Sequence, residues 1–357
     1  MTARRVVDGV LAQCRVNLVP DFLGQWSSRR LPDLQPLQSH LIFSSLHWGA
    51  VAPNASYVFL AAYQNAVTDL MLSMKVDGFQ QLLTQPAHPA SGATSDTLCS
   101  RFCLSATEKL GNHIKVLETL IVQPIATSRS VLVRGLKTIT TEAQRADYIL
   151  VVGRQHLDSD LEGRVVCVCR AAAEKAHQIM LEEHSGEGLD FVKDLKHYSL
   201  QFLDAPGELL VSSKDEQPIS GDNALRLFRI LEDLHIVVAM GAHVAKACAD
   251  VLLLSAKDQF ADLCTAIHST IEVYSSIIRQ LQDGGRSFKI EDQTLVVLHG
   301  SLRLCRQTTT SCVATLVHAS MQDSVRDLDK DLRILSIAEK VRTLRFERSL
   351  QRLLVRN

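Results

Sequence analysis

The chain has 357 residues, of which 46% are hydrophobic and 22% are charged, and its formal net charge at pH 7 is -1. A chain of this size can bury one large or two medium cores without help from disulfides or a structural metal. The balanced charge argues against a dedicated nucleic-acid-binding protein, which usually shows a basic excess.

Cysteine usage and the N-terminus bear on the compartment. The nine cysteines form no regular framework, and most fall in apolar patterns where a free thiol behaves as a small hydrophobe. This indicates a reducing compartment. No apolar run reaches the ~18 residues of a membrane span, and Arg4 and Arg5 precede no apolar signal region. We expect a cytoplasmic protein, with a nuclear location or an arginine-containing mitochondrial presequence as alternatives.

Apolar periodicity predicts helices through the N-terminal half of the chain. Residues 6–18 repeat at helical spacing, and residues 57–83 are apolar nearly all round, as a central helix of a bundle is. Further helices are predicted over residues 95–123, 131–149 and 159–183, the last beginning at a capping-box pattern, Ser159 to Glu162. These segments make a predicted N-terminal helical lobe over residues 1–184.

Residues 185–221 interrupt this pattern with several glycines and prolines. We predict an irregular connector here, with a small β-hairpin near residues 200–212. Long irregular segments inside compact proteins are uncommon and often functional.

The C-terminal part has the clearest pattern. Apolar residues step by three and four over residues 225–252, 260–281, 295–316 and 325–335. A heptad-like stripe on successive helices is typical of antiparallel bundles. We therefore predict an all-α protein of antiparallel helical bundles with about nine or ten helices, of which residues 222–357 form the C-terminal bundle.

Two polar groupings were weighed as sites. His156, Asp158, Asp160 and Glu162 offer metal ligands or an acid–base pair, but the same residues suit the start of a helix, which we favour. Cys167 and Cys169 lack the spacing and the second pair of a zinc site. Cys99 and Cys103 are interpreted as buried core thiols, and His235 and His243 each as a satisfied histidine that is buried or lies at the core boundary.

The last helix is basic and amphipathic. Such a helix can bind an acidic partner, a phosphate backbone or an anionic membrane surface, and a tryptophan near arginines can dock a peptide. The candidate partner-binding residues are Arg342, Arg345, Arg348, Arg352, Arg356 and Trp26.

The sequence contains no HExxH, GxxxxGK[ST] or GxSxG motif, so we assign no catalytic, cofactor-binding or metal-binding residue. The resulting hypothesis is a non-catalytic scaffold or adaptor subunit with protein partners, as a homo- or hetero-oligomer. One alternative is an anionic-surface binder acting through the last helix. The other is an all-α enzyme with its site at the lobe boundary, near residues 158–221.

Overall fold

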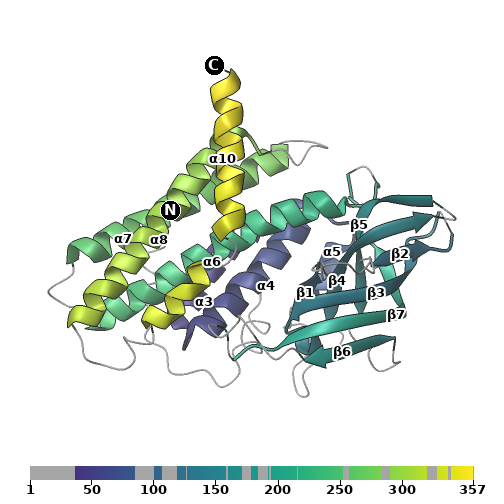
Figure 1. Ribbon diagram of the computed structural model, residues 1–357, viewed down its shortest axis with the longest axis horizontal. Helices are drawn as coiled ribbons and strands as arrows, with labels where there is room; N and C mark the ends of the chain where they lie inside the picture. The colour runs from purple at the N-terminus through teal and green to yellow at the C-terminus, as the bar shows by residue number, and fades with distance from the viewer. Residues whose placement is uncertain are drawn as a thin grey trace, which may run out of the picture. The chain divides into compact units, whose positions relative to one another are not determined.

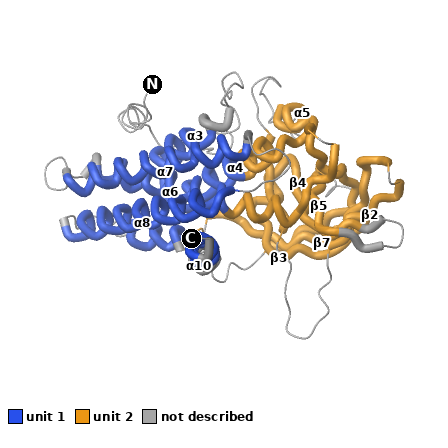
Figure 2. The backbone as a smooth tube through the Cα atoms, turned by 90° about the horizontal axis from the view of Figure 1, so that it is seen from above, with its two compact units in different colours: residues 1–20, 35–66, 230–357 blue, residues 21–34, 67–229 orange. Residues whose placement is uncertain are grey.

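The computed structural model describes most of the chain. The described residues are 37–84, 100–106, 119–157, 160–170, 178–183, 192–251, 257–283, 290–319, 328–336 and 339–356, without residues 126, 193 and 215. The chain divides into two compact units (Figure 2). Unit 1 comprises residues 1–20, 35–66 and 230–357, and unit 2 comprises residues 21–34 and 67–229.

Unit 1 is helical. Its helices are α3 (Leu37–Val51), most of α4 (Ala55–Ser73) and of α6 (Gly221–Val251), α7 (Lys257–Asp283), α8 (Asp292–Ala319) and α10 (Glu339–Arg356), with a 3-10 helix at Leu332–Ser336. The first turns of α7 and α8 contain Asp258 and Asp292, where a negative charge favours the positive end of the helix dipole. The helices expected from the stripes over residues 225–252, 260–281 and 295–316 are present as α6, α7 and α8.

The apolar segment 57–83 is two helices rather than one. Helix α4 ends at Ser73, and α5 (Phe79–Thr84) begins after a turn. Lys75 and Gly78 have φ values of 51° and 68°, which a continuing right-handed helix does not allow. Apolar composition alone does not mark this break.

Unit 2 contains a β-barrel, so the all-α prediction is wrong. Its strands are β1 (Phe102–Ser105), β2 (Leu120–Gln123), β3 (Ser130–Thr141), β4 (Tyr148–Leu157), β5 (Asp160–Arg170), β6 (Ile179–Glu183) and β7 (His197–Leu209). Strands β4, β2, β3, β7 and β5 follow one another, and β5 pairs again with β4 to close the barrel (Figure 1). Strand β1 pairs with β4, and β6 pairs with β7, outside the closed ring.

The helices predicted over residues 95–123, 131–149 and 159–183 are therefore absent where the structure describes these segments. The apolar residues of β3 alternate between buried and exposed positions, while Val165 to Cys169 of β5 are all buried. Valine, isoleucine and threonine make up half of β3, and valine makes up most of the stretch in β5; these residues favour strands. Short apolar runs fit either a strand or a buried helix, and residues 160–162 belong to β5 rather than to a helix start.

The hairpin expected near residues 200–212 is also wrong, because residues 197–209 form the single strand β7. Pro206 and Gly207 suggested a turn. Asp204 is the extra residue of a bulge opposite Val133 and Arg134, and its φ of 53° accommodates the irregularity without ending the strand.

The division of the chain at residues 184 and 222 stays a prediction. Within the described part of the chain, no helix is long and apolar enough to cross a membrane.

Candidate functional site

Three thiols on the strands of unit 2 are buried. Cys103, Cys167 and Cys169 are fully buried. Burial, with a smaller contribution from Cys169, raises the pKa of the Cys103 thiol, and burial also raises the pKa of Cys167. Thiols that stay protonated are neither nucleophiles nor metal ligands. The interpretation of Cys103 as a buried thiol is confirmed, while Cys99 lies outside the described residues.

A group of polar side chains gathers where β1 and β3 end and β7 begins. We call Ser105, Thr140, Thr141 and His197 the hydroxyl cluster. Ser105 Oγ and Thr140 Oγ1 are 2.8 Å apart, and Thr141 Oγ1 lies 3.2 Å from Nδ1 of His197. Thr141 pairs with His197 in the antiparallel register of β3 and β7. None of the four side chains is more than 7% exposed.

Glu142 fixes the backbone beside this cluster. It is buried and has a φ of 53°, a conformation that is uncommon outside glycine. Its Oε1 accepts a hydrogen bond of 2.7 Å from the backbone N–H of Lys196, and its own N–H donates to the Lys196 carbonyl over 2.8 Å. These bonds hold the residues before β7 against the end of β3, so Thr141 and His197 have defined positions.

The cluster has the chemistry of a neutral hydrogen-bonding surface. A hydroxyl carries one donor and two acceptor sites, so Ser105, Thr140 and Thr141 keep capacity after bonding within the cluster. Such groups suit the edge of a heteroaromatic ring, where carbonyl acceptors and N–H donors alternate. They do not by themselves provide a strong acid, a nucleophile or a phosphate site.

A pocket of about 380 Å³ lies elsewhere in unit 2. It is lined by Leu82, Tyr148, Val168, Arg170, Gln178, Pro206, Gly207 and Glu208. Burial raises the pKa of Tyr148. The lining residues that the structure describes include no histidine or cysteine, and Arg170 and Glu208 carry opposite charges. The pocket is of ligand size but assembles no nucleophile–base pair.

Unit 1 contains a serine–histidine pair that resembles a nucleophile and its base. Ser45 Oγ lies 2.8 Å from Nδ1 of His235, and the Asn65 amide donates to Ser45 Oγ over 2.9 Å. All three residues are fully buried, and the ring of His235 makes an edge contact with Tyr274. Because Ser45 Oγ is bonded to both His235 and Asn65 inside the helical core, we interpret the pair as a structural network. His235 is thus the satisfied buried histidine that the sequence predicts.

The polar residues predicted near the lobe boundary belong to a strand pair. His156 is in β4 and pairs with Leu161 of β5, while Asp158 lies outside the described residues. Across the residues that the structure describes, no three His, Cys, Asp or Glu side chains are placed to hold a metal ion.

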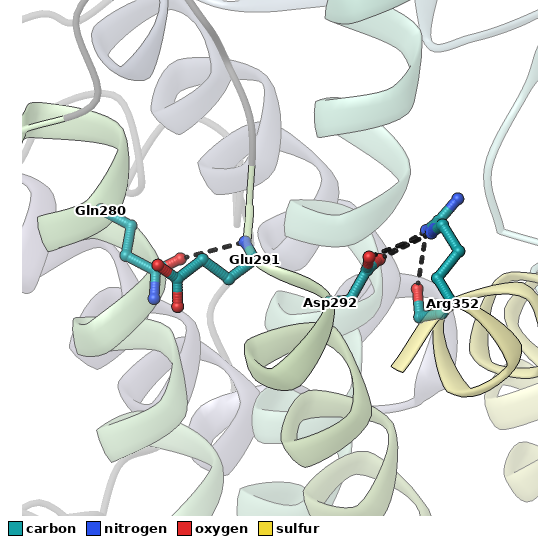
Figure 3. Close-up of polar contacts among 5 residues, drawn as sticks. Gln280, Glu291, Asp292 and Arg352 are labelled. Atoms are coloured by element: carbon teal, nitrogen blue, oxygen red, sulfur yellow. Dashed lines mark hydrogen bonds and ion pairs between the residues drawn. The ribbon is translucent and has the colours of Figure 1, made fainter. Parts of the chain in front are cut away.

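Of the predicted partner-binding arginines, Arg352 is engaged within unit 1. Its Nε lies 3.0 Å from both carboxylate oxygens of Asp292, and its Nη2 lies 2.6 Å from Oδ1 (Figure 3). Its Nη2 also donates to Ser349 Oγ over 3.1 Å. Arg348 is exposed. The side chains of Arg342, Arg345 and Arg356, and Trp26, lie outside the described residues, and the partner-binding role stays a prediction.

Replacing Arg352 should loosen α10 from α8. We expect Arg352→Gln to lower the free energy of unfolding by ~0.5–1 kcal/mol, because a half-exposed pair with bidentate geometry contributes about that much. Urea unfolding of the parent, Arg352→Gln, Asp292→Asn and the double variant gives the interaction free energy between the two side chains. Arg348→Gln, on the same helix, is the control and should change little. Additive losses in the double variant would contradict this role of the pair.

Comparisons with known proteins identify the fold. No family model and no curated protein match the sequence. Glutaryl-CoA dehydrogenase from Mycobacterium smegmatis superimposes with a TM-score of 0.62 at 12% identity, covering 98% of this chain and 95% of that chain. FMN-bound TdsC from Paenibacillus sp. A11-2 superimposes with a TM-score of 0.63 at 12% identity, covering 99% of this chain and 98% of that chain. The HsaA monooxygenase from M. tuberculosis gives 0.55 at 12% identity, covering 94% and 89%.

These similarities overturn the hypothesis of a non-catalytic scaffold, which depended on an all-α bundle. The solved structures that share this architecture over nearly the whole chain include a dehydrogenase and a monooxygenase. The alternative of an enzyme agrees with them better, although its all-α fold was wrong. The chain has an acyl-CoA dehydrogenase-like fold, with helices and a β-barrel in one polypeptide.

Proposed function

We propose that this protein is a flavin-dependent oxidoreductase. The observation that carries the proposal is the hydroxyl cluster where β1 and β3 end and β7 begins, in a chain whose fold is shared with an FMN-bound protein. A bound flavin supplies hydride and electron transfer, which protein side chains do not provide.

The residues fit the ring of such a cofactor. Ser105, Thr140 and Thr141 offer neutral donors and acceptors to the polar edge of an isoalloxazine ring. Their burial excludes water, so each hydrogen bond made there is stronger than at a wet surface. His197 orients the Thr141 hydroxyl, and Glu142 holds the backbone that carries both.

The phosphate part of the cofactor is not assigned to these residues. The nearby cations already have partners, since Lys196 Nζ lies 2.8 Å from Glu183 Oε2 and Arg145 Nε lies 3.6 Å from Glu142 Oε2. The hydroxyl cluster therefore accounts for ring recognition, and it distinguishes neither FAD from FMN nor one substrate from another.

Removing one hydroxyl should weaken flavin binding. We expect Thr141→Val to raise the Kd for FAD or FMN by ~10-fold, since the lost hydrogen bond contributes about 1.4 kcal/mol. Adding Ser105→Ala should weaken binding further. Titration of the purified chain followed by quenching of flavin fluorescence measures the Kd.

Thr270→Val is the matched control. Thr270 is a fully buried threonine of α7 whose hydroxyl donates to the Ala266 carbonyl over 2.9 Å. This variant loses a buried hydroxyl outside the cluster and should bind flavin as the unmodified protein does. Equal Kd values for Thr141→Val, Thr270→Val and the parent would remove the cluster from the site.

The two kinds of enzyme that share the fold differ in how the flavin is reduced. Anaerobic mixing of the flavin-loaded protein with butyryl-CoA, followed at 450 nm, tests the dehydrogenase reaction, in which the thioester reduces the flavin directly. Bleaching supports it. An unchanged spectrum that bleaches on addition of NADH with a flavin reductase favours the monooxygenase reaction. The cytoplasmic location stays a prediction.

A further inference from the structure

Three successive described helices of unit 1 carry four thiols. They are Cys248 on α6, Cys264 on α7, and Cys305 and Cys312 on α8. Cys248, Cys305 and Cys312 are buried and Cys264 is partly exposed. Neither the scaffold hypothesis nor the proposed flavin chemistry uses any of them.

Two contacts between α6 and α8 show which residues of the two helices lie side by side. A Cβ built on Gly241 of α6 would lie 3.6 Å from the Sγ of Cys305 on α8. The next thiol on α8, Cys312, is hydrogen-bonded to Cys248 of α6. Cys248 lies seven residues after Gly241 on α6, and Cys312 lies seven residues after Cys305 on α8, which is two helical turns in each case. The two helices therefore run in the same direction with one register, and this register brings Cys248 to Cys312.

The surroundings of the pair favour sulfur chemistry over metal binding. The S–H of Cys312 donates to the Gln259 carbonyl over 3.3 Å, at the start of α7. The hydrogen bond from Cys248 lowers the pKa of Cys312, whereas the same bond, with burial, raises the pKa of Cys248. Cys264 is near enough to affect Cys248 electrostatically, yet among the residues described no three ligands are placed to hold a metal ion.

We propose that Cys248 and Cys312 are a redox-active pair that forms a reversible disulfide when the protein meets a hydroperoxide. The bond would join α6 to α8 covalently within unit 1. The proposal is independent of the flavin, because it rests on helices and thiols that the hydroxyl cluster does not contain.

The chemistry balances with hydrogen peroxide as the oxidant. Cys312 loses its S–H proton, its thiolate attacks one peroxide oxygen and the O–O bond breaks. The sulfenic acid of Cys312 forms, and the hydroxide that is released takes up the proton to give the first water. Cys248 sulfur then attacks the Cys312 sulfur, the S–O bond breaks, and the proton of Cys248 leaves with the oxygen as water. In total, two thiols and one peroxide give one disulfide and two waters. A dithiol such as dithiothreitol reverses the reaction by exchange.

Tryptic cleavage separates the four thiols, which makes the test direct. Peptides 247–257, 258–279, 304–306 and 307–326 each contain one of them. The full-length protein is treated with hydrogen peroxide or with dithiothreitol, free thiols are blocked with N-ethylmaleimide, and the peptides are identified by mass spectrometry. We expect peptides 247–257 and 307–326 to appear joined in the peroxide sample and separate in the dithiothreitol sample.

Cys305 provides the control. Burial raises its pKa to about 12, and it faces Gly241 rather than a second thiol. Cys305→Ser should leave the joined peptides unchanged, and Cys312→Ser should abolish them. Unjoined peptides in peroxide-treated parent protein, or a main disulfide that contains Cys264, would overturn the proposal. Because the joined peptides are sought in the parent protein, this test does not depend on whether a variant folds.

Discussion

Gly49→Ala should destabilise unit 1 even though alanine is the better helix former. A Cβ on Gly49 of α3 would lie 2.2 Å from the carbonyl oxygen and 2.6 Å from the Cα of Ala239 on α6. Both atoms belong to the backbone, so α3 and α6 would have to separate. Overpacking of this kind costs about 3 kcal/mol, and the gain in helix propensity of about 1 kcal/mol leaves a net loss of ~2 kcal/mol.

The matched control has the opposite expected sign. Gly300 is an exposed glycine of α8, and a Cβ there meets no atom within 4 Å. Gly300→Ala should therefore stabilise the protein by ~0.5–1 kcal/mol. Trp48 is buried beside Gly49, so urea unfolding followed by tryptophan fluorescence in a Trp26→Phe background reports on this unit. Similar midpoints for the two glycine variants would refute the close approach of α3 to α6.

Acidification should destabilise unit 1 through His243. Burial lowers the pKa of this histidine from 6.5 to about 4, and a hydrogen bond to the backbone of Gly49 opposes the shift in part. Above pH 6.5 both the folded and the unfolded states hold a neutral ring. Between pH 6.5 and 4 only the unfolded state takes up the proton, so the free energy of unfolding falls by about 1.4 kcal/mol per pH unit, to a loss of ~3 kcal/mol.

His243→Gln tests this pH dependence. Glutamine is neutral at every pH and keeps an N–H donor, so the variant should lose less stability than the parent between pH 7 and pH 4. The difference should approach 3 kcal/mol. His318→Gln, at an exposed position near the end of α8, should lose as much unfolding free energy between pH 7 and pH 4 as the parent protein does. A parallel loss of stability in the parent and in His243→Gln would contradict the assignment to His243.

The helices of unit 1 were predictable because the spacing of their apolar residues fits only a helix. Stripes that step by three and four over more than twenty residues fit a helix and no strand. The basic last helix that the sequence predicts is present as α10. Strand β3 shows the opposite case. Leu132, Leu136 and Ile139 step by four and three as in a helix, while Ser130 to Arg134 alternate between buried and more exposed positions as in a strand. The density of valine and threonine was the signal that favoured strands.

The hydroxyl cluster could not be found from the sequence. Serine and threonine are common at strand ends, and Ser105, Thr140 and His197 are far apart in the chain. Only the barrel topology brings β1, β3 and β7 together at one end. His197 does lie within residues 158–221, where the enzyme alternative placed a site. Of the polar residues that the sequence singled out, however, His156 belongs to β4 and Asp160 and Glu162 belong to β5, a different pair of strands.

Flavin binding by the full-length purified protein tests the central claim most directly. The protein is titrated with FAD and with FMN, and bound flavin is measured by fluorescence quenching and by its absorbance near 450 nm. Our account predicts saturable binding of one flavin per chain by the parent protein and by Thr270→Val, with ~10-fold weaker binding by Thr141→Val. A folded parent protein that binds neither flavin would contradict it.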